Sequence, residues 1–220
     1  MRTRAPRFES QQRARILDAA VRVFAEKGYR GATTRVLGRA ARVNSALIYY
    51  YFENKHTLFA EAIRMIMRGF MERLQDRHAS LSGARDRLGY LVNGIFDYYL
   101  EHPDRMRLMF FTLLLYPALF TEALRSFVKE QPVVPIQILQ DGVNRGELSP
   151  MHPLQAWWSI LGLCMFSLLT RDVVPNVGSH LVGVPLFKVG DRKAQIIDLL
   201  MRGLATPKEA SMKSKKELKR

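Results

Sequence analysis

The chain has 220 residues, and its 34 lysine and arginine side chains outnumber its 20 acidic ones, which gives a net charge of +14. This length suits one or two domains and is enough to bury a full core. The basic excess lies at the two ends, because residues 1–55 hold 12 basic and 4 acidic side chains and residues 205–220 hold 6 and 2. Such ends suit a polyanion, either nucleic acid or an anionic membrane face, although solubility alone would explain them equally well.

Cys164 is the only cysteine, which excludes an intrachain disulfide and favours a reducing, cytoplasmic compartment. The longest apolar run, residues 156–169, is shorter than the roughly 20 residues that span a bilayer, so it predicts a buried helix. The arginines near the start of the chain are not followed by an apolar stretch, and a secretory signal is therefore not expected.

Residues 1–9 are basic and lack any period, which predicts a flexible arm. From Ser10 onward apolar side chains recur at the spacing of one helix face, and Gly28 follows where a left-handed C-cap belongs. These features predict a first helix between Ser10 and Gly28. A second helix is expected to start from a cap at Thr33 or Thr34.

The second helix is expected to end near Arg42, because Asn44 soon afterwards is a cap-type residue that competes with helical hydrogen bonds. A third helix over residues 45–51 is then barely two turns long, and it needs packing against its neighbours to be stable. Asn54 is placed to cap a long fourth helix over residues 55–80. Two short capped helices in succession are typical of a helix-turn-helix, which places one of them in the major groove of DNA.

The pattern beyond residue 83 stays helical, without strand-like alternation, so we predict an all-α fold. A three-helix helix-turn-helix domain over residues 10–55 is followed by a larger helical domain over residues 56–205 and a basic disordered tail over residues 206–220. The stretch 173–189 is a loop rich in glycine and proline whose course the pattern does not predict. The later helices are expected at residues 85–100, 103–117, 118–130, 136–145, 153–171 and 194–204.

A long set of residues between 28 and 58 matches the pattern of a known family: Gly28-Tyr29, Thr33-Thr34-Arg35, Leu37, Ala41, Val43-Asn44, Ala46-Leu47-Ile48-Tyr49-Tyr50-Tyr51-Phe52, Lys55 and Leu58. The match covers roughly residues 10–60 and resembles the N-terminal DNA-binding domain of the TetR-type (tetracycline-repressor-like) transcriptional regulators. Arg42 and Ala46 stand where that family usually has glycine, and Gly38 where it usually has alanine. A left-handed arginine in the turn would cost on the order of 1 kcal/mol, so the turn is expected to differ or to be strained.

A helix-turn-helix offers the first residues of its second helix to base edges, while flanking residues bind phosphates. For Tyr49 the alternative is core packing, in which it fills the small domain together with Phe52. The predicted DNA contacts are Thr34, Arg35, Asn44, Ser45, Leu47, Tyr49, Tyr50, Tyr51 and Lys55.

The resemblance also implies a homodimer that spans two half-sites of a palindromic operator, about 34–36 Å apart, and that pairs through its last two helices. The composition of these two helices is consistent with pairing between chains, because it leaves apolar surface that packing within a single chain need not bury. Packing within the monomer alone is the alternative. The predicted interface residues are Trp158, Leu161, Met165, Leu168, Ile197, Leu200 and Leu204.

A cavity for a small-molecule effector among helices four to eight is a further implication of the resemblance. Methionine and aromatic side chains are often plain core, yet their low charge here favours an apolar or aromatic effector. Effector binding would bias the dimer towards an arrangement that releases DNA and relieves repression. The candidate wall residues are Met67, Phe70, Phe96, Tyr99, Met106, Phe110, Phe111, Tyr116, Trp157 and Phe166.

Other functions fit the sequence less well. Glu53 and His56 form one Glu-x-x-His pair, whereas a di-iron bundle needs two such pairs and further carboxylates. His102, His152 and His180 lack metal-ligand spacing, so no enzyme activity, metal or cofactor is expected. A peripheral membrane or adaptor protein would suit the basic ends but does not explain the two short capped helices. A transcriptional activator of the same fold remains an open alternative.

Overall fold

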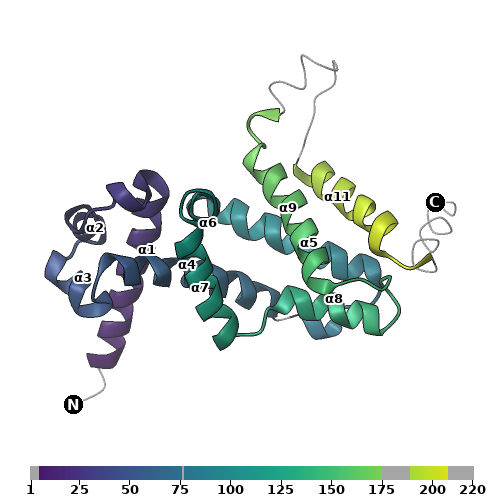
Figure 1. Cartoon of the computed structure of the whole chain (residues 1–220), viewed down its shortest axis with the longest axis horizontal. Coiled ribbons are helices and arrows are strands. Elements are labelled where there is room, and N and C mark those ends of the chain that lie inside the picture. Colours follow the sequence, from purple (N-terminus) through teal and green to yellow (C-terminus); the bar gives the residue numbers. More distant parts are fainter. Residues whose placement is uncertain (1–4, 76, 175–188, 208–220) are drawn as a thin grey trace. The chain divides into compact units, whose positions relative to one another are not determined.

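The computed structural model describes residues 5–75, 77–174 and 189–207, and this part of the chain is helical without a β-strand. The all-α prediction is therefore confirmed for these residues. Figure 1 shows the elements in chain order. Their bounds are α1 Ala5–Gly31, α2 Thr34–Ala41, α3 Ser45–Phe52, α4 Lys55–Gln75, the 3₁₀ turn η1 His78–Ser80, α5 Ala84–Glu101, α6 Pro103–Leu115, α7 Pro117–Glu130, α8 Val134–Asn144, α9 Pro153–Leu169 and α11 Val189–Leu204.

The helices form two compact units that are interleaved along the chain. The first unit, Met1–Gly69 with His102–Pro132, holds α1, α2, α3, most of α4, α6 and α7. The second unit, Phe70–Glu101 with Val133–Arg220, holds the end of α4 together with α5, α8, α9 and α11. Packing thus groups α6 and α7 with the helix-turn-helix helices, whereas the functional division expected at residue 55 stays a prediction.

Helix α1 starts at Ala5 rather than after Ser10, so residues 5–9 are helical where a flexible arm was expected. Pro6 is compatible with this start, because a proline in the first turn of a helix loses no hydrogen bond. Gly28 leaves the helical region with φ 67° and ψ 174°, which breaks α1 near its end. The predicted end of the regular first helix at Gly28 is therefore confirmed.

Side chains cap the starts of the helices within residues 32–58, which we call the helix-turn-helix segment. The side-chain oxygens of Thr33, Asn44 and Asn54 accept backbone N–H groups at 3.3, 3.0 and 2.9 Å, at the starts of α2, α3 and α4. Helices α2 and α3 have 8 residues each, a length that is marginal without such caps. All three predicted caps are confirmed.

Helix α4 ends at Gln75, earlier than the predicted residue 80, and a 3₁₀ turn follows over His78–Ser80. Gly83 then adopts a φ of 83° just before α5 begins. Because glycine alone takes that conformation without steric cost, it marks the end of the connector. The long helix and its start were thus predicted correctly, but its end was not.

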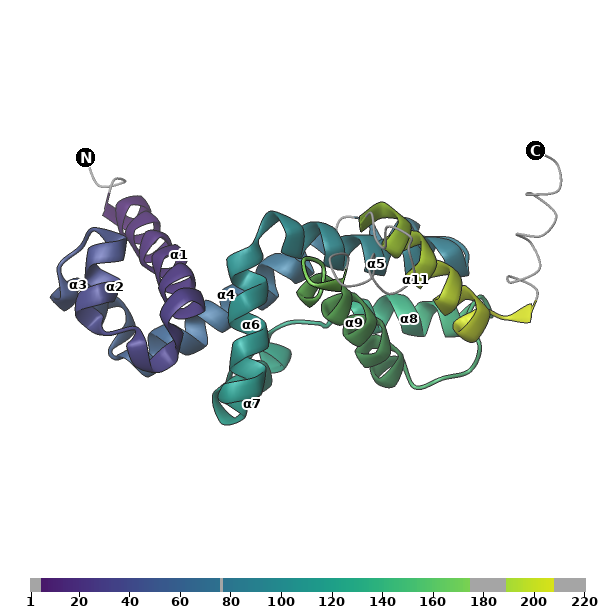
Figure 2. The same ribbon diagram turned by 90° about the horizontal axis from the view of Figure 1, so that it is seen from above.

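Helix α5 is the centre of the second unit. It packs against α8, α9 and α11, and α9 also contacts α8 and α11, as the grouping of these helices in Figure 2 shows. On α5, Leu88, Leu91, Val92 and Ile95 are fully buried. This face follows the three-and-four spacing of a helix, which explains why the sequence pattern predicts α5 nearly to its ends.

A buried arginine also lies in the core of the second unit. Arg87 on α5 is 1% exposed, and its guanidinium donates to the carboxylate of Glu147 and to the backbone carbonyl of Leu81 at 3.1 Å. A buried charge is tolerated only when it is paired and hydrogen-bonded in this way. The pair ties α5 to the connector between α8 and α9.

The observed bounds of the last helices differ slightly from the predicted ones. Helix α9 stops at Leu169, and α11 begins at Val189, five residues before the predicted 194. The predicted loop 173–189 and tail 206–220 lie largely outside the described residues. Cys164 is buried on α9, and burial raises the pKa of its thiol to about 12, so it stays protonated at neutral pH.

No single helix in the described ranges is long and apolar enough to cross a membrane. Helices α6 and α7 meet that test of length and composition only as a pair, and they bend by 117° at their junction.

Candidate nucleic-acid interface

The turn between α2 and α3 is built around a left-handed arginine. Arg42 has φ 53° and ψ 46°, and its N–H donates to the carbonyl of Arg39 at 3.2 Å. The next N–H, of Val43, donates to the carbonyl of Gly38 at 2.9 Å. These two bonds satisfy the last carbonyls of α2 in the way that a glycine-ended helix does. The predicted strain is confirmed, and it costs on the order of 1 kcal/mol relative to glycine.

Gly38 makes this turn possible, because a side chain there would collide with it. A Cβ at position 38 would lie 2.9 Å from the carbonyl oxygen of Val43 and 3.3 Å from Oγ of Ser45. The first distance is shorter than real Cβ contacts, and the atom it meets is backbone. The glycine therefore sets how closely the start of α3 approaches α2.

Helix α3 buries one face and exposes the other. Ile48 and Phe52 are 0% and 1% exposed, and the guanidinium of Arg13 lies over the Phe52 ring at 5.0 Å. Tyr49 and Tyr50 are 49% and 71% exposed, so neither ring fills the core. The alternative in which Tyr49 is a core residue is thus wrong, whereas Phe52 does belong to the core.

Tyr51 lies between these two faces and is half-buried, with its ring 5.1 Å from that of Tyr50 in an edge-on arrangement. Partial burial, followed by the negative charge of Glu9, raises the pKa of the Tyr51 phenol above its ordinary value. The hydroxyl therefore stays protonated at neutral pH and keeps a hydrogen to donate to an anionic oxygen.

The remaining predicted DNA-contact residues in α2 and α3 gather around the same turn. Asn44 and Arg35 are exposed, and Thr34 and Leu47 are half-buried. Half-buried Ser45 has its Oγ 3.5 Å from the carbonyl of Thr34, which links the starts of the two helices. The capping bond uses only the carbonyl side of the Asn44 amide, so its NH₂ group keeps its donors.

Lys55 differs from the others because its ammonium group is engaged within the chain. Its Nζ donates to the backbone carbonyl of Tyr29 at 3.1 Å and lies 4.5 Å from the centre of the Tyr29 ring. This contact fixes the start of α4 against the end of α1. A lysine ammonium has three donors, so the predicted phosphate contact stays a prediction.

Several interactions that position the helix-turn-helix were not predicted from the sequence. Arg13 on α1 and Arg64 on α4 both pair with Glu61, and Arg64 also donates to Ser126 of α7 at 2.8 Å. In addition, Nε2 of His56 lies 3.3 Å from a carboxylate oxygen of Glu122 on α7. Apart from Arg64 and Glu61, which are three residues apart on α4, the partners are far apart in sequence, so no local pattern could have revealed those contacts. Together they hold α1, α4 and α7 against one another in the first unit.

The ten candidate effector contacts do not form one site within either unit. Phe70, Phe96, Tyr99 and Trp157 are buried in the second unit, where the Phe70 ring stacks at 6.1 Å on both Tyr99 and Trp157. Phe166 belongs to the same unit but is 65% exposed, which argues against a place in a cavity wall. Buried Met67, half-buried Met106, Phe110 and Tyr116, and exposed Phe111 belong to the first unit.

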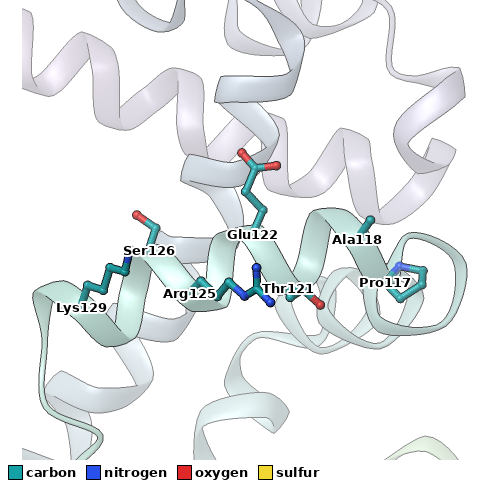
Figure 3. Close-up of a pocket in the computed structure, with 7 residues that line it drawn as sticks. All are labelled: Pro117, Ala118, Thr121, Glu122, Arg125, Ser126 and Lys129. Carbon is teal, nitrogen blue, oxygen red and sulfur yellow. The ribbon is translucent and has the colours of Figure 1, made fainter.

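A surface hollow of about 640 Å³ lies elsewhere, along α7. Figure 3 shows its lining, which includes Thr121, Glu122, Arg125, Ser126 and Lys129 and none of the ten candidates. Because all its lining residues come from one helix, it is an open depression rather than an enclosed cavity.

The predicted dimer residues separate into exposed and buried sets. Trp158 is 46% exposed, and Leu161, Met165, Ile197 and Leu204 are half-buried. Leu168 and Leu200 are only 1% and 5% exposed because they pack inside the second unit, which argues against them as interface residues. The sequence analysis missed the other exposed apolar side chains of α9, which lie at helical spacing from Trp158: Leu154, Phe166 and Leu169.

The histidines considered for metal binding are dispersed. Over the described ranges no group of three or more His, Cys, Asp or Glu side chains could hold a metal ion. His56 faces Glu122, and His180 lies outside the described residues.

Comparison with known proteins agrees with this geometry. The model of a family described as bacterial regulatory proteins, tetR family, matches residues 16–62. The HTH-type transcriptional repressor NicS of Pseudomonas putida is 29% identical over 221 residues, which cover 93% of this chain and 99% of that protein. The HTH-type transcriptional repressor SCO4008 of Streptomyces coelicolor is 30% identical over 181 residues, 81% of this chain and 88% of that protein. Among solved structures, the transcriptional regulator FadR from Bacillus subtilis in complex with stearoyl-CoA is similar in fold, with a TM-score of 0.65 and 20% identity over 85% of this chain and 96% of that one.

Proposed function

This chain belongs to the tetR family of bacterial regulatory proteins and is a DNA-binding transcriptional regulator, and we propose that it is a repressor released from its operator by a small molecule. The observation that carries the proposal is the exposed face of α3, where Tyr50 is 71% exposed on a helix whose other face is buried. Tyr49 beside it is 49% exposed, and neighbouring exposed aromatic side chains of this kind are typical of a surface that binds a partner. Two relatives of nearly full length are named repressors, which supports repression over activation.

Within this proposal residues 10–55 bind DNA, with α3 in the major groove. Asn44, Ser45 and Leu47 meet base edges, while Thr34, Arg35 and Lys55 contact phosphates on either side. The phenols of Tyr49, Tyr50 and Tyr51 donate to phosphates or pack on thymine methyl groups. Because the operator is chromosomal DNA, the protein acts in the cytoplasm.

The active form is a homodimer that pairs through α9 and α11 of the second unit. The exposed row on α9 supports this arrangement, because Leu154, Trp158, Phe166 and Leu169 lie on solvent-facing positions of one helix. Burying such a row against its copy would remove apolar area from water. Sedimentation of the purified protein at micromolar concentration should then give the mass of two chains, and a single chain would contradict the dimer.

The effector is an apolar or aromatic molecule bound by residues 56–205. The stacked rings of Phe70, Tyr99 and Trp157 in the second unit support this class, because an apolar ligand can replace such ring contacts without leaving buried polar groups unpaired. Binding biases the dimer towards an arrangement in which both α3 helices cannot engage their half-sites together.

Gel-shift titration with the intergenic DNA upstream of the gene tests DNA binding, and it should give an affinity that falls steeply with salt. Binding that is absent, or insensitive to salt, would contradict the proposal. A thermal-shift screen of acyl-CoA thioesters, fatty acids and aromatic acids would identify ligands, and a true effector should lower DNA affinity. A reporter fused to the same DNA distinguishes repression from activation by the sign of its response.

A further inference from the structure

Arg42 is held in a backbone conformation that is unfavourable for arginine. Its φ of 53° lies in the left-handed region, where glycine has no steric cost and arginine does. The side chain is exposed, and over the ranges that the structure describes no carboxylate forms an ion pair with it. The fold therefore loses backbone stability at this position without a compensating ion pair in the described ranges.

The strained turn is not relaxed by a change in its geometry. Val43 still donates to Gly38 at 2.9 Å, and the missing Cβ of Gly38 lets the turn lie close to α2. The backbone thus keeps the left-handed conformation and the arginine follows it.

Two further arginines lie on the same side of α2. Arg35 and Arg39 are exposed and four residues apart, which places them on one face of α2, and exposed Arg42 follows directly after the end of that helix. No acidic residue occurs between residues 32 and 52 to balance them. Like charges four residues apart oppose helix formation, so the pairing of Arg35 with Arg39 on this face does not favour folding.

A phosphate backbone is the ligand that explains these features together. A guanidinium binds phosphate oxygens through two parallel hydrogen bonds, which a lysine or a neutral side chain does not reproduce. Arg42 lies two residues before Asn44, the cap of α3, so it flanks the start of the helix proposed to enter the groove. Its position suits a phosphate at the groove edge.

We infer that Arg42 binds a DNA phosphate and continues the row of contacts made by Arg35 and Arg39, at the expense of folding stability. The inference rests on the proposed DNA-binding function. It makes opposite predictions for stability and for DNA affinity, because the same side chain opposes folding and favours binding.

The test compares Arg42→Asn with Arg42→Lys and with Arg145→Ala, which removes an exposed charge from the second unit. Asparagine tolerates the left-handed region, so Arg42→Asn should raise the melting temperature by about 2–4 °C. A phosphate contact is sequence-independent, so a labelled mixed-sequence duplex of about 40 base pairs, long enough for two half-sites, suffices as the probe.

Affinity is measured by anisotropy between about 50 and 200 mM KCl. Arg42→Asn should weaken binding on the order of tenfold and make the slope of log K against log salt shallower by about 1 per protomer. Arg42→Lys should keep most of the slope, and Arg145→Ala should match the wild type in both affinity and slope.

Two results would overturn the inference while leaving the proposed function intact. One is an Arg42→Asn protein that is more stable yet binds DNA with unchanged affinity and slope, which would mean that the strain has no role in binding. The other is a less stable Arg42→Asn protein, which would show that the turn favours arginine for folding. Failure of the wild type to bind any duplex would instead refute the proposed function, and the inference with it.

Discussion

The helix-turn-helix segment and the second unit hold their helices in different ways. In the segment, α2 and α3 have 8 residues each, and side-chain oxygens cap both of them. In the second unit, α9 has 17 residues, begins with Pro153 and lacks a side-chain cap, but buries Ile160 and Cys164 completely. Short helices depend on local hydrogen bonds, whereas longer ones depend on burial of one face. Local capping leaves the side chains of the short helices free to face a partner.

Strain and buried charge are also distributed differently between these regions. Among the described residues, the non-glycine residues with positive φ are Arg42 and Glu53, both in the helix-turn-helix segment. In the second unit Gly83 and Gly146 occupy such positions, and the notable cost there is the buried Arg87. The free-energy cost of backbone strain at the surface can be offset when a ligand binds there. The cost of burying a charge must instead be offset by partners within the fold.

The largest expected effect is on the buried pair. Arg87→Ala should lower the free energy of unfolding by about 3–5 kcal/mol, because it leaves the carboxylate of Glu147 without its partner. Urea denaturation measures the change. The matched control is Arg85→Ala, which removes the exposed pair with Asp198 at 2.8 Å and should cost about 0–1 kcal/mol. Equal losses in the two variants would contradict the distinction between buried and exposed pairs.

Glycine-to-alanine substitutions should change the free energy of unfolding in opposite directions in the helix-turn-helix segment and in the second unit. Gly38→Ala should destabilise by about 1 kcal/mol, since a clash of roughly 1–3 kcal/mol with the carbonyl of Val43 outweighs the gain in helix propensity. In the second unit, Gly89→Ala meets only Ile197 at 3.8 Å and should stabilise by about 0.5–1 kcal/mol. Thermal unfolding of both variants checks the signs, and stabilisation by Gly38→Ala would show that the turn is looser than described.

Removing a side-chain cap should cost stability in the helix-turn-helix segment, whereas the start of α9 has no such cap to lose. Asn54→Ala loses the bonds that Oδ1 accepts from the N–H and hydroxyl of Thr57 at 2.9 and 3.2 Å, and should cost about 1 kcal/mol. His152 occupies the equivalent position before α9 without a capping bond, so His152→Ala should leave the unfolding midpoint nearly unchanged. A similar loss of stability in Asn54→Ala and His152→Ala would contradict the expected difference between the two regions.

The smallest expected effect is a pH dependence in the second unit. Desolvation acts to raise the pKa of Glu147, but hydrogen bonds from Arg87 and from the backbone of Gly83, with the charge of Arg87, outweigh it and lower the pKa. The folded state therefore binds fewer protons, so this stabilisation is present above the ordinary value of 4.5 and is lost as pH falls below it. Unfolding of Glu147→Gln between about pH 3 and 6 should show a weaker dependence than the wild type. Identical profiles would contradict the assignment.

Local features of the fold were predictable from sequence, and long-range ones were not. The caps at Thr33, Asn44 and Asn54 and the left-handed Arg42 depend on a few adjacent residues, so the sequence specifies them. The pairing of Arg87 with Glu147 joins residues 60 positions apart, and burial of an arginine contradicts the usual expectation for that side chain. Burial of Leu168 and Leu200 inside the second unit was not anticipated for a related reason, because periodicity identifies apolar faces but not what covers them.

The candidate site shows the same division. Exposure of Tyr50 follows from its place opposite Ile48 and Phe52 on a short helix, because residues two apart in a helix point in nearly opposite directions. The bond from Lys55 to the carbonyl of Tyr29 could not be anticipated, because it depends on how α4 meets the end of α1. Positions on one helix face were therefore predictable, whereas the partner of each polar group required the tertiary structure.

DNA binding by a Tyr50→Ala variant is the most direct test of whether the exposed face of α3 contacts the operator. The substitution should lower affinity for the upstream intergenic duplex by about tenfold or more. Tyr50→Phe removes only the hydroxyl, so its affinity should show how much of this loss is due to the hydroxyl and how much to the ring. Because Tyr50 is 71% exposed, the free energy of unfolding should change by less than about 0.5 kcal/mol. Unchanged affinity in a stably folded Tyr50→Ala protein would contradict the proposed interface.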